Sequence, residues 1–331
     1  MSRRLEKRIA NKFIRMILLV IATSILTFLL MKASPIDPLQ ANVGQAALGS
    51  MSQEQVEKLK EYWGVGVSPV RQYLEWAADF IRGDMGMSLL YRRPVAEVIS
   101  VKLTNSLLLM VIAWVFSGIL GFFLGVISGM NQGKRIDRVV KGYCLLISST
   151  PTFWLALLLL MVFGVWLKVL PIGLSVPIGV EAAGVTVADR IYHAILPALT
   201  LSITGVSNIA LHTREKMIGI MNSDYVLFAR ARGEKGWILF KHHGFRNALL
   251  PAVTLHFAAV SEIFGGSVLV EQVFSYPGLG QAAVSAGLGS DMPLLMAITI
   301  ISALLVFGGN MIADILYGIV DPRIRKGGMA G

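Results

Sequence analysis

The chain has 331 residues, of which 55% are hydrophobic and only 15% are charged, and its mean hydropathy is +0.66. Soluble domains carry about 25% charged residues, so this composition excludes a soluble globular protein and indicates an integral membrane protein. The net charge of +10 would suggest nucleic-acid binding in a soluble protein. In a membrane protein the cytoplasmic loops collect Lys and Arg, so no nucleic-acid partner is expected.

Six apolar segments predict membrane-spanning helices, because a helix needs roughly 20 apolar residues to cross the hydrocarbon core. The segments are Phe13–Met31, Leu103–Ser128, Tyr143–Leu170, Ala194–Leu211, Ala248–Val270 and Leu294–Val320. The first follows a run of basic residues, as a signal peptide does, but no clear cleavage pattern comes after it. Residues 1–31 are therefore interpreted as an N-terminal tail with a retained anchor, and residues 103–320 as the membrane core.

The long loop of residues 32–102 contains two amphipathic patterns. The segment from Ser52 to Gly64 begins with a capping pattern, and the segment from Ser68 to Gly83 places Pro69 at the first helical position. Two short helices are expected there. They either pack against the membrane face or help to receive an external partner.

Orientation follows from the basic residues. With the N-terminus inside, the inner pieces hold twenty Lys and Arg and the two short outer loops hold one. This positive-inside distribution predicts that both termini, including the tail 321–331, lie in the cytoplasm. The loop 32–102 is then extracytoplasmic, and the loop 214–247 is cytoplasmic.

No phosphate-binding loop, HExxH motif or Ser-His-Asp motif is found, so the sequence predicts no catalytic centre, no cofactor and no metal site. The only cysteine, Cys144, rules out an intrachain disulfide. Within the spans, three glycines at four-residue intervals form a stripe that favours close helix packing: Gly121, Gly125 and Gly129.

Polar residues inside the later spans are candidates for a transport pathway, because a charge at mid-membrane costs on the order of 3 kcal/mol and avoids lipid. Glu262 is the clearest case, and a buried structural pair is its alternative role. The candidate pathway residues are Ser207, Asn208, His256 and Glu262.

The basic segment Asn222–Pro251 lies between two hydrophobic spans and is too long for a simple turn. It is rich in helix-forming residues, which indicates a folded cytoplasmic element that a partner protein can bind. Its sequence resembles the conserved loop of ATP-binding-cassette importer permeases, in particular the oligopeptide, dipeptide and nickel branch. The matching pieces are Asp224–Val226, Ala229–Gly233 and His243–Pro251, and further similar blocks run through the chain: Gly83–Ile99, Ser149–Leu160, Ile195–Ser202, Val270–Gly280 and Asp314–Arg325.

The resemblance implies an all-α, six-helix type I importer permease fold with a small helical extracytoplasmic region after the first helix. It implies a second homologous permease chain, two ATPase subunits and an extracytoplasmic solute-binding protein as partners, in a bacterial or archaeal inner membrane. ATP hydrolysis would belong to the ATPase subunits. The implied ATPase-coupling residues are Ala229, Arg230, Ala231, Arg232, Gly233 and Gly236. Arg230 and Arg232 have an alternative interpretation as plain membrane-surface cations. The motif departs from the general pattern where Leu227 replaces a Glu and where Gly244 replaces an Ala.

The cargo is not determined by the sequence. Short peptides are the first expectation, and nickel or a metal chelate is the alternative within the same class. A proton-coupled secondary transporter, with His256 and Glu262 as relay groups, is the alternative of another class. A membrane scaffold without transport activity is a further possibility, which would not need inward-facing polar residues.

Overall fold

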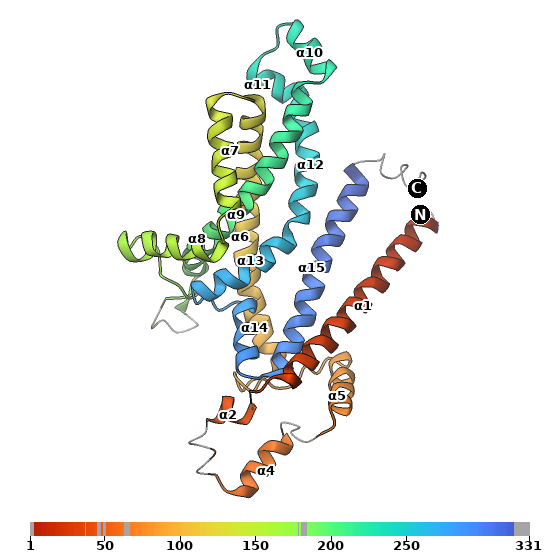
Figure 1. Ribbon diagram of the computed structural model, residues 1–331, viewed down its shortest axis with the longest axis vertical. Coiled ribbons are helices and arrows are strands. Elements are labelled where there is room, and N and C mark those ends of the chain that lie inside the picture. Colours follow the sequence, from red (N-terminus) through yellow and green to blue (C-terminus); the bar gives the residue numbers. More distant parts are fainter. Residues whose placement is uncertain are drawn as a thin grey trace. The chain divides into compact units, whose positions relative to one another are not determined.

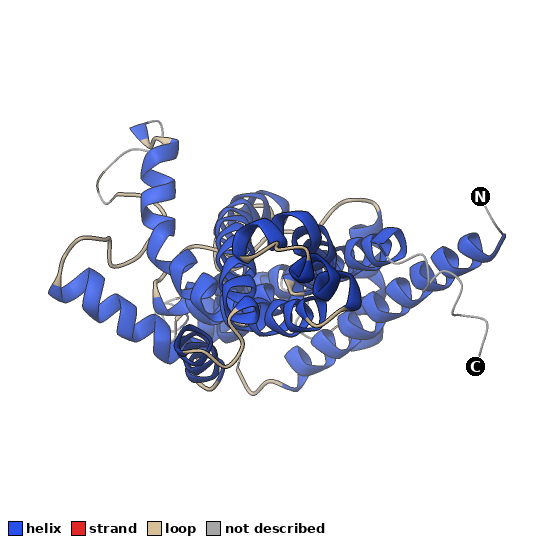
Figure 2. Ribbon diagram, turned by 90° about the horizontal axis from the view of Figure 1, so that it is seen from above, coloured by secondary structure: helices blue, strands red, loops and turns tan. Residues whose placement is uncertain are grey.

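The computed structural model describes residues 3–36, 38–44, 48, 51–62, 67–177, 179 and 184–320. Within these ranges every regular element is a helix (Figures 1 and 2), in agreement with the expected all-α class. The chain divides into two compact units. One comprises residues 1–105 and 277–307, and the other comprises residues 106–276 and 308–331.

The first unit holds the anchor helix and the extracytoplasmic segments predicted by the sequence. Its helices are α1 (Arg3–Ala33), α2 (Pro38–Val43), α4 (Gln53–Tyr62), α5 (Pro69–Ile81), the start of α6 (Val95–Met130), α14 (Leu279–Leu288) and the first part of α15 (Met292–Val320). Helix α14 was not predicted, because its ten residues lie in a segment expected to be a loop.

The capping signals of the sequence act as expected. The hydroxyl of Ser52 accepts from the backbone of Gln55 at 3.2 Å, and the side chain of Gln55 accepts from the backbone of Ser52 at 3.0 Å. This reciprocal capping box starts α4. Pro69 occupies the first turn of α5, and Gly83, with φ of +93°, follows its end.

Helix α5 packs on α1. The hydroxyls of Ser24 and Tyr73 are 2.8 Å apart, and the rings of Phe28 and Tyr73 meet edge to face with centroids 5.4 Å apart. In the part of α1 whose burial is described, residues 11–33, Ser24 and Phe28 are buried and the other side chains are exposed or half-buried. Since α1 buries little else among the described residues, these contacts are what hold it to α5.

A buried carboxylate ties the start of α15 to the segment before α6. Asp291 is fully buried and accepts from the hydroxyl of Ser88 at 2.5 Å and from the backbone of Leu90 at 3.0 Å. Burial raises the pKa of Asp291, although these hydrogen bonds oppose the shift.

The second unit holds the rest of α6 together with the helices that carry the candidate site. They are α7 (Arg135–Ser148), α8 (Thr152–Leu159) with the π-helical segment η1 (Leu160–Trp166), α9 (Val187–Met221), α10 (Asp224–Ala231), α11 (Gly236–Leu239), the π-helical segment η3 (Phe240–Gly244), α12 (Phe245–Ala258) and α13 (Val260–Val273).

Among the described residues, four helices are long and apolar enough to cross a membrane, and two bent pairs raise the number to six if each pair is one span. The predicted third span, Tyr143–Leu170, falls on the pair α7 and α8–η1, which is bent by 104° between Ser148 and Thr152 and is therefore not one straight helix. The predicted fifth span, Ala248–Val270, falls on the pair α11–α12 and α13, which is bent by 47° at Ala259; Pro251 lies inside α12. Pro197 lies within the continuous helix α9.

The glycine stripe of α6 lies directly against α9. A Cβ atom at Gly121 would stand 2.8 Å from Cβ of Ile209, and one at Gly125 would stand 2.5 Å from Cβ of Thr213. At Gly129 the distance to Cβ of Met217 would be 2.6 Å. Because real Cβ atoms do not approach this closely, only glycine permits this separation of the two helices.

Candidate functional site

The connector between α9 and α12, residues 222–244, is the best-defined candidate site. Figure 1 shows α10 and α11 at the tip of the hairpin that α9 and α12 form. Helix α10 starts after Ser223, whose hydroxyl bonds the carbonyl of Ile220 at 2.5 Å. The basic segment singled out in the sequence is therefore a folded element with a short helix of its own.

Helix α10 has two apolar faces. Val226 and Ala229 are buried in a core cluster with residues of α6, α9, η3 and α12. On the other side, Tyr225, Leu227 and Phe228 are exposed, Phe228 to 66%. The helix is thus attached to the core by one face and presents large apolar side chains with the other, which is typical of a surface that another protein covers.

The end of α10 is fixed by a glycine turn. Gly233 has a φ of +96°. Its N–H bonds the carbonyl of Arg230 at 2.9 Å, and the N–H of Glu234 bonds the carbonyl of Ala229 at 3.1 Å. These two bonds form a Schellman motif, in which glycine takes the left-handed conformation at little cost.

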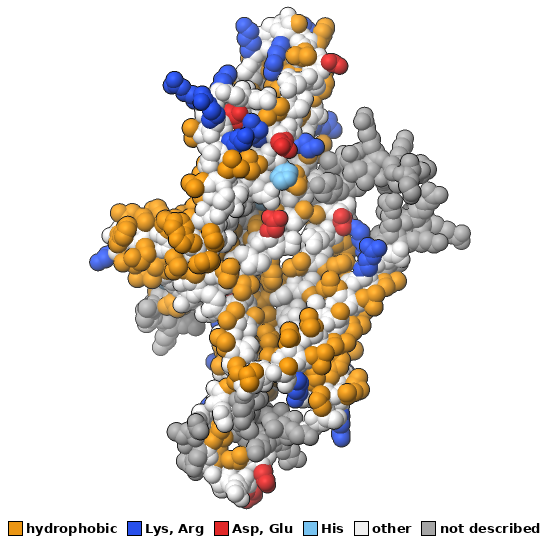
Figure 3. Space-filling model, in the orientation of Figure 1, with side chains coloured by type: hydrophobic (Ala, Val, Ile, Leu, Met, Phe, Trp, Pro, Cys, Tyr) orange, Lys and Arg blue, Asp and Glu red, His pale blue; other side chains and the backbone are white. Residues whose placement is uncertain are grey.

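Exposed basic side chains surround the apolar face. Figure 3 shows Lys and Arg side chains standing among hydrophobic ones around α10 and α11. The exposed apolar residues that follow α10 are Trp237 and Ile238. The exposed basic residues of this surface are Arg230, Arg232, Lys235 and Lys241. A partner surface that fits it has apolar side chains at its centre and acidic groups around them.

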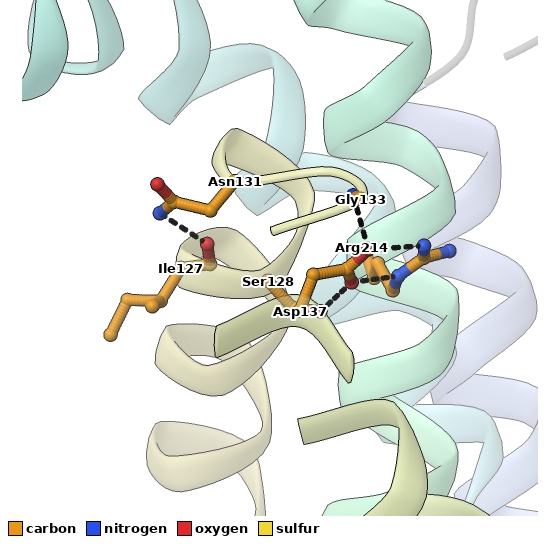
Figure 4. Close-up of polar contacts among 6 residues, drawn as sticks. All are labelled: Ile127, Ser128, Asn131, Gly133, Asp137 and Arg214. Atoms are coloured by element: carbon orange, nitrogen blue, oxygen red, sulfur yellow. Dashed lines mark hydrogen bonds and ion pairs between the residues drawn. The ribbon is translucent and has the colours of Figure 1, made fainter. Parts of the chain in front are cut away.

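The part of α9 that leads into the connector is held to α7 by an ion pair (Figure 4). Arg214 donates to the two oxygens of Asp137 from Nε at 2.6 Å and from Nη2 at 2.9 Å. Ser128 Oγ donates to Asp137 at 2.6 Å, and the N–H of Gly133 donates at 2.8 Å. Only 4% of the Asp137 side chain and 17% of the Arg214 side chain are exposed, so the pair is a buried, bidentate one.

The predicted ATPase-coupling residues occupy different positions in the connector. Arg230, Ala231, Arg232, Gly233 and Gly236 are exposed. Ala229 is 3% exposed and packs into the chain's own core. It therefore attaches α10 to the core and is not accessible to an ATPase subunit. The large exposed side chains Leu227, Phe228 and Trp237 were not selected from the sequence. The sequence pattern that could have identified them is the presence of large apolar residues within a basic loop.

The four predicted pathway residues do not form one group. Nδ2 of Asn208 donates to Oε2 of Glu262 at 3.1 Å, and both residues line a cavity of about 180 Å³ between α6, α8, α9 and α13. Ser207 is buried and does not line this cavity. His256 stacks on Trp114, with ring centroids 4.2 Å apart, and lines a separate, apolar cavity.

Comparison with known proteins agrees with this architecture. The family model of the binding-protein-dependent transport system inner membrane component matches residues 121–326. The oligopeptide transport system permease protein AppB of Bacillus subtilis is 39% identical over 93% of this chain and 95% of the relative. A putative peptide transport system permease of Brucella abortus is 34% identical with the same coverage of both chains. A probable peptide ABC transporter permease of Sinorhizobium fredii is 29% identical over 96% of this chain and 98% of the relative.

The chain therefore belongs to the family of inner-membrane permeases of binding-protein-dependent ATP-binding-cassette importers. It is a multi-pass membrane protein of a transport family rather than of a catalytic one.

Proposed function

We propose that the chain is the permease subunit of an ATP-driven importer of short peptides. The two-faced helix α10 is the observation that carries this proposal. One face is locked into the core through Val226 and Ala229, and the other presents Phe228 and its neighbours to a partner. The peptide assignment rests on the relatives in Bacillus and Brucella, which are described as oligopeptide and peptide permeases.

Helix α10 transmits force because it is tied to the helices on both sides. Its buried face shares one core cluster with Phe122 of α6, Met217 of α9 and Ala252 of α12. Protein cores are close-packed and deform little, so a displacement of α10 moves these helices with it. Each of two ATPase subunits would bind one α10. When ATP binding brings the two subunits together, each α10 would move and displace the membrane helices, so that the pathway opens alternately to the two sides of the membrane.

The Asn208–Glu262 cavity is part of the proposed pathway. Its volume of about 180 Å³ is smaller than the roughly 300–1,000 Å³ of small-molecule sites, so one chain does not enclose a peptide. A second permease chain facing this cavity would complete the path. The exposed carboxylate of Glu262 is then in a wet channel, where its charge is tolerated.

The proposed orientation places the connector and both termini in the cytoplasm of a bacterial or archaeal cell. Residues 32–102 then face the solute-binding protein and residues 103–320 form the permease core, and the expected cytoplasmic tail, 321–331, lies outside the described residues. Cysteines introduced singly as Ser285→Cys and Ser223→Cys test this. An impermeant thiol reagent is expected to label position 285 in intact cells and position 223 only after lysis. The reverse pattern would exclude the orientation.

Cross-linking tests the proposed ATPase contact. The native Cys144 is buried, so introduced cysteines are the accessible ones. Ala231→Cys, at an exposed position, is expected to cross-link to a copurifying ATPase subunit. Ala229→Cys, two residues away but buried, is the matched control and is expected to remain uncross-linked. Absence of a cross-link at every exposed position from Arg230 to Gly236, or uptake without any ATPase, would overturn the proposal.

A further inference from the structure

Three potential metal ligands converge beside the end of α10. The side chains of Glu234, His242 and His243 place one donor atom each within 4.8 Å of one another. Oε2 of Glu234 lies 3.3 Å from Nδ1 of His242 and 3.2 Å from Nε2 of His243. Nothing in the coupling role of α10 requires this cluster.

The local fold brings these residues together. Glu234 follows Gly233, and its backbone N–H closes the Schellman motif, which fixes the direction of its side chain. The two histidines are neighbours in η3, and their rings stand nearly perpendicular, at 87°. One turns Nδ1 and the other turns Nε2 toward the same carboxylate oxygen. Single π-helical turns of this kind often occur at functional sites.

The two contacts of Oε2 lie within hydrogen-bond range, and their lengths also suit donors that share one metal ion. A charge-assisted N–H···O bond is about 2.7–2.9 Å long, and both contacts to Glu234 are longer, at 3.2 and 3.3 Å. In tetrahedral zinc coordination the donors stand about 2.0–2.1 Å from the ion, which separates any two donors by about 3.3 Å. The contacts of Oε2 therefore have the length of two edges of a zinc tetrahedron.

The donor set selects the kind of ion. Two imidazole nitrogens and one carboxylate oxygen suit zinc and similar divalent transition metals, whereas Mg²⁺ and Ca²⁺ prefer sites made of oxygen ligands. The exposed fractions of the side chains are 25% for Glu234, 31% for His243 and 58% for His242. The site is thus closed on the side of the chain and most open to solvent beside His242.

We propose that Glu234, His242 and His243 form a binding site for a divalent transition metal of the zinc type in the connector. The ion bridges the turn that ends α10 to the π-helical segment η3 that leads into α12. This bridge fixes the connector at the point where α10 would pass motion to α12. The proposal depends on these three side chains and not on the identity of the cargo.

The test measures metal binding by the full-length chain in its purified transporter complex. The complex is isolated through a tag without histidines, stripped with a chelator and dialysed against micromolar Zn²⁺, and zinc per chain is measured by atomic emission. Variants are Glu234→Gln and His242→Ala. The matched control is His212→Ala, at another exposed histidine, on α9. His242 is the most exposed ligand, so its variant is expected to leave folding and assembly unchanged on gel filtration.

One zinc ion per chain is expected in the parent and in His212→Ala. Loss of one ligand is expected to weaken binding by at least about tenfold, because even outer-shell changes cost about 10–100-fold. X-ray absorption of the loaded complex is expected to show two imidazoles and light-atom ligands near 2.0 Å. The proposal fails if the parent retains no zinc, or if Glu234→Gln and His242→Ala bind it as tightly as the parent does.

Discussion

Removal of Arg214 is expected to destabilise the contact between α9 and α7 near the connector. In Arg214→Met the side chain keeps its approximate length, but the carboxylate of Asp137 stays buried, 3% exposed, without its counter-charge. Two charge-assisted bonds are lost, at 2.6 and 2.9 Å. Breaking one side of a buried pair costs about 3–5 kcal/mol. Since Ser128 and Gly133 still donate to Asp137, we expect the lower end, about 3 kcal/mol.

A double substitution separates the charge from the packing. Asp137→Asn removes the stranded charge and keeps the shape, so Asp137→Asn with Arg214→Met is expected to be more stable than Arg214→Met alone, by about 1–2 kcal/mol. The assay is denaturant unfolding of the detergent-purified complex for the parent, both single variants and the double variant. A loss below about 1 kcal/mol in Arg214→Met, or no recovery in the double variant, would refute the reasoning.

Three further substitutions test the connector, the cavity and the helix packing. Gly233→Val has open space around its new side chain, but the residue has a φ of +96°. The resulting backbone strain, about 1–2 kcal/mol, is expected to reduce both transport and cargo-stimulated ATP hydrolysis. Gly233→Asn is the control and is expected to keep near-parent activity, because Asn tolerates that backbone conformation. Glu262→Gln is expected to lower uptake at an unchanged amount of assembled complex; disappearance of the protein from the membrane would instead indicate a structural role. Gly125→Leu would place its Cβ 2.6 Å from the carbonyl oxygen of Ala210, a backbone atom that cannot move aside, so we expect a loss of folded protein on gel filtration. Gly142→Leu is the control and is expected to be tolerated, because no atom lies within 4 Å of its new Cβ.

The sequence was sufficient for features that depend on local chemistry. Hydropathy located the long helices α1, α6, α9 and α15. The Ser52 and Pro69 signals located α4 and α5, and glycine spacing located a stripe that lies against α9. Periodicity did not reveal that the third span is broken by 104°, because an apolar run looks the same whether it is straight or bent. Pro151 lies at that break, but Pro197 lies within the continuous helix α9, so a proline alone does not determine where a span bends.

Features that depend on tertiary geometry could not be predicted from the sequence. Ala229 and Ala231 have the same chemistry, and only the rotation of α10 on the core makes one buried and the other exposed. Ser207 and Asn208 are adjacent, but only Asn208 lines the cavity with Glu262. The cluster of Glu234 with the two histidines was missed because its ligands converge through a glycine turn and a π-helical segment, neither of which has a fixed sequence spacing.

The exposed apolar face of α10 affects the permease chain before its partner subunits bind. Phe228 and Trp237, 66% and 55% exposed, are apolar groups of the kind that cellular quality control recognises on incomplete assemblies. On the proposed assembly, docking of an ATPase subunit hides them. The same surface that transmits force in the finished transporter would then mark an orphan permease for degradation, and would couple the lifetime of the chain to the supply of its ATPase.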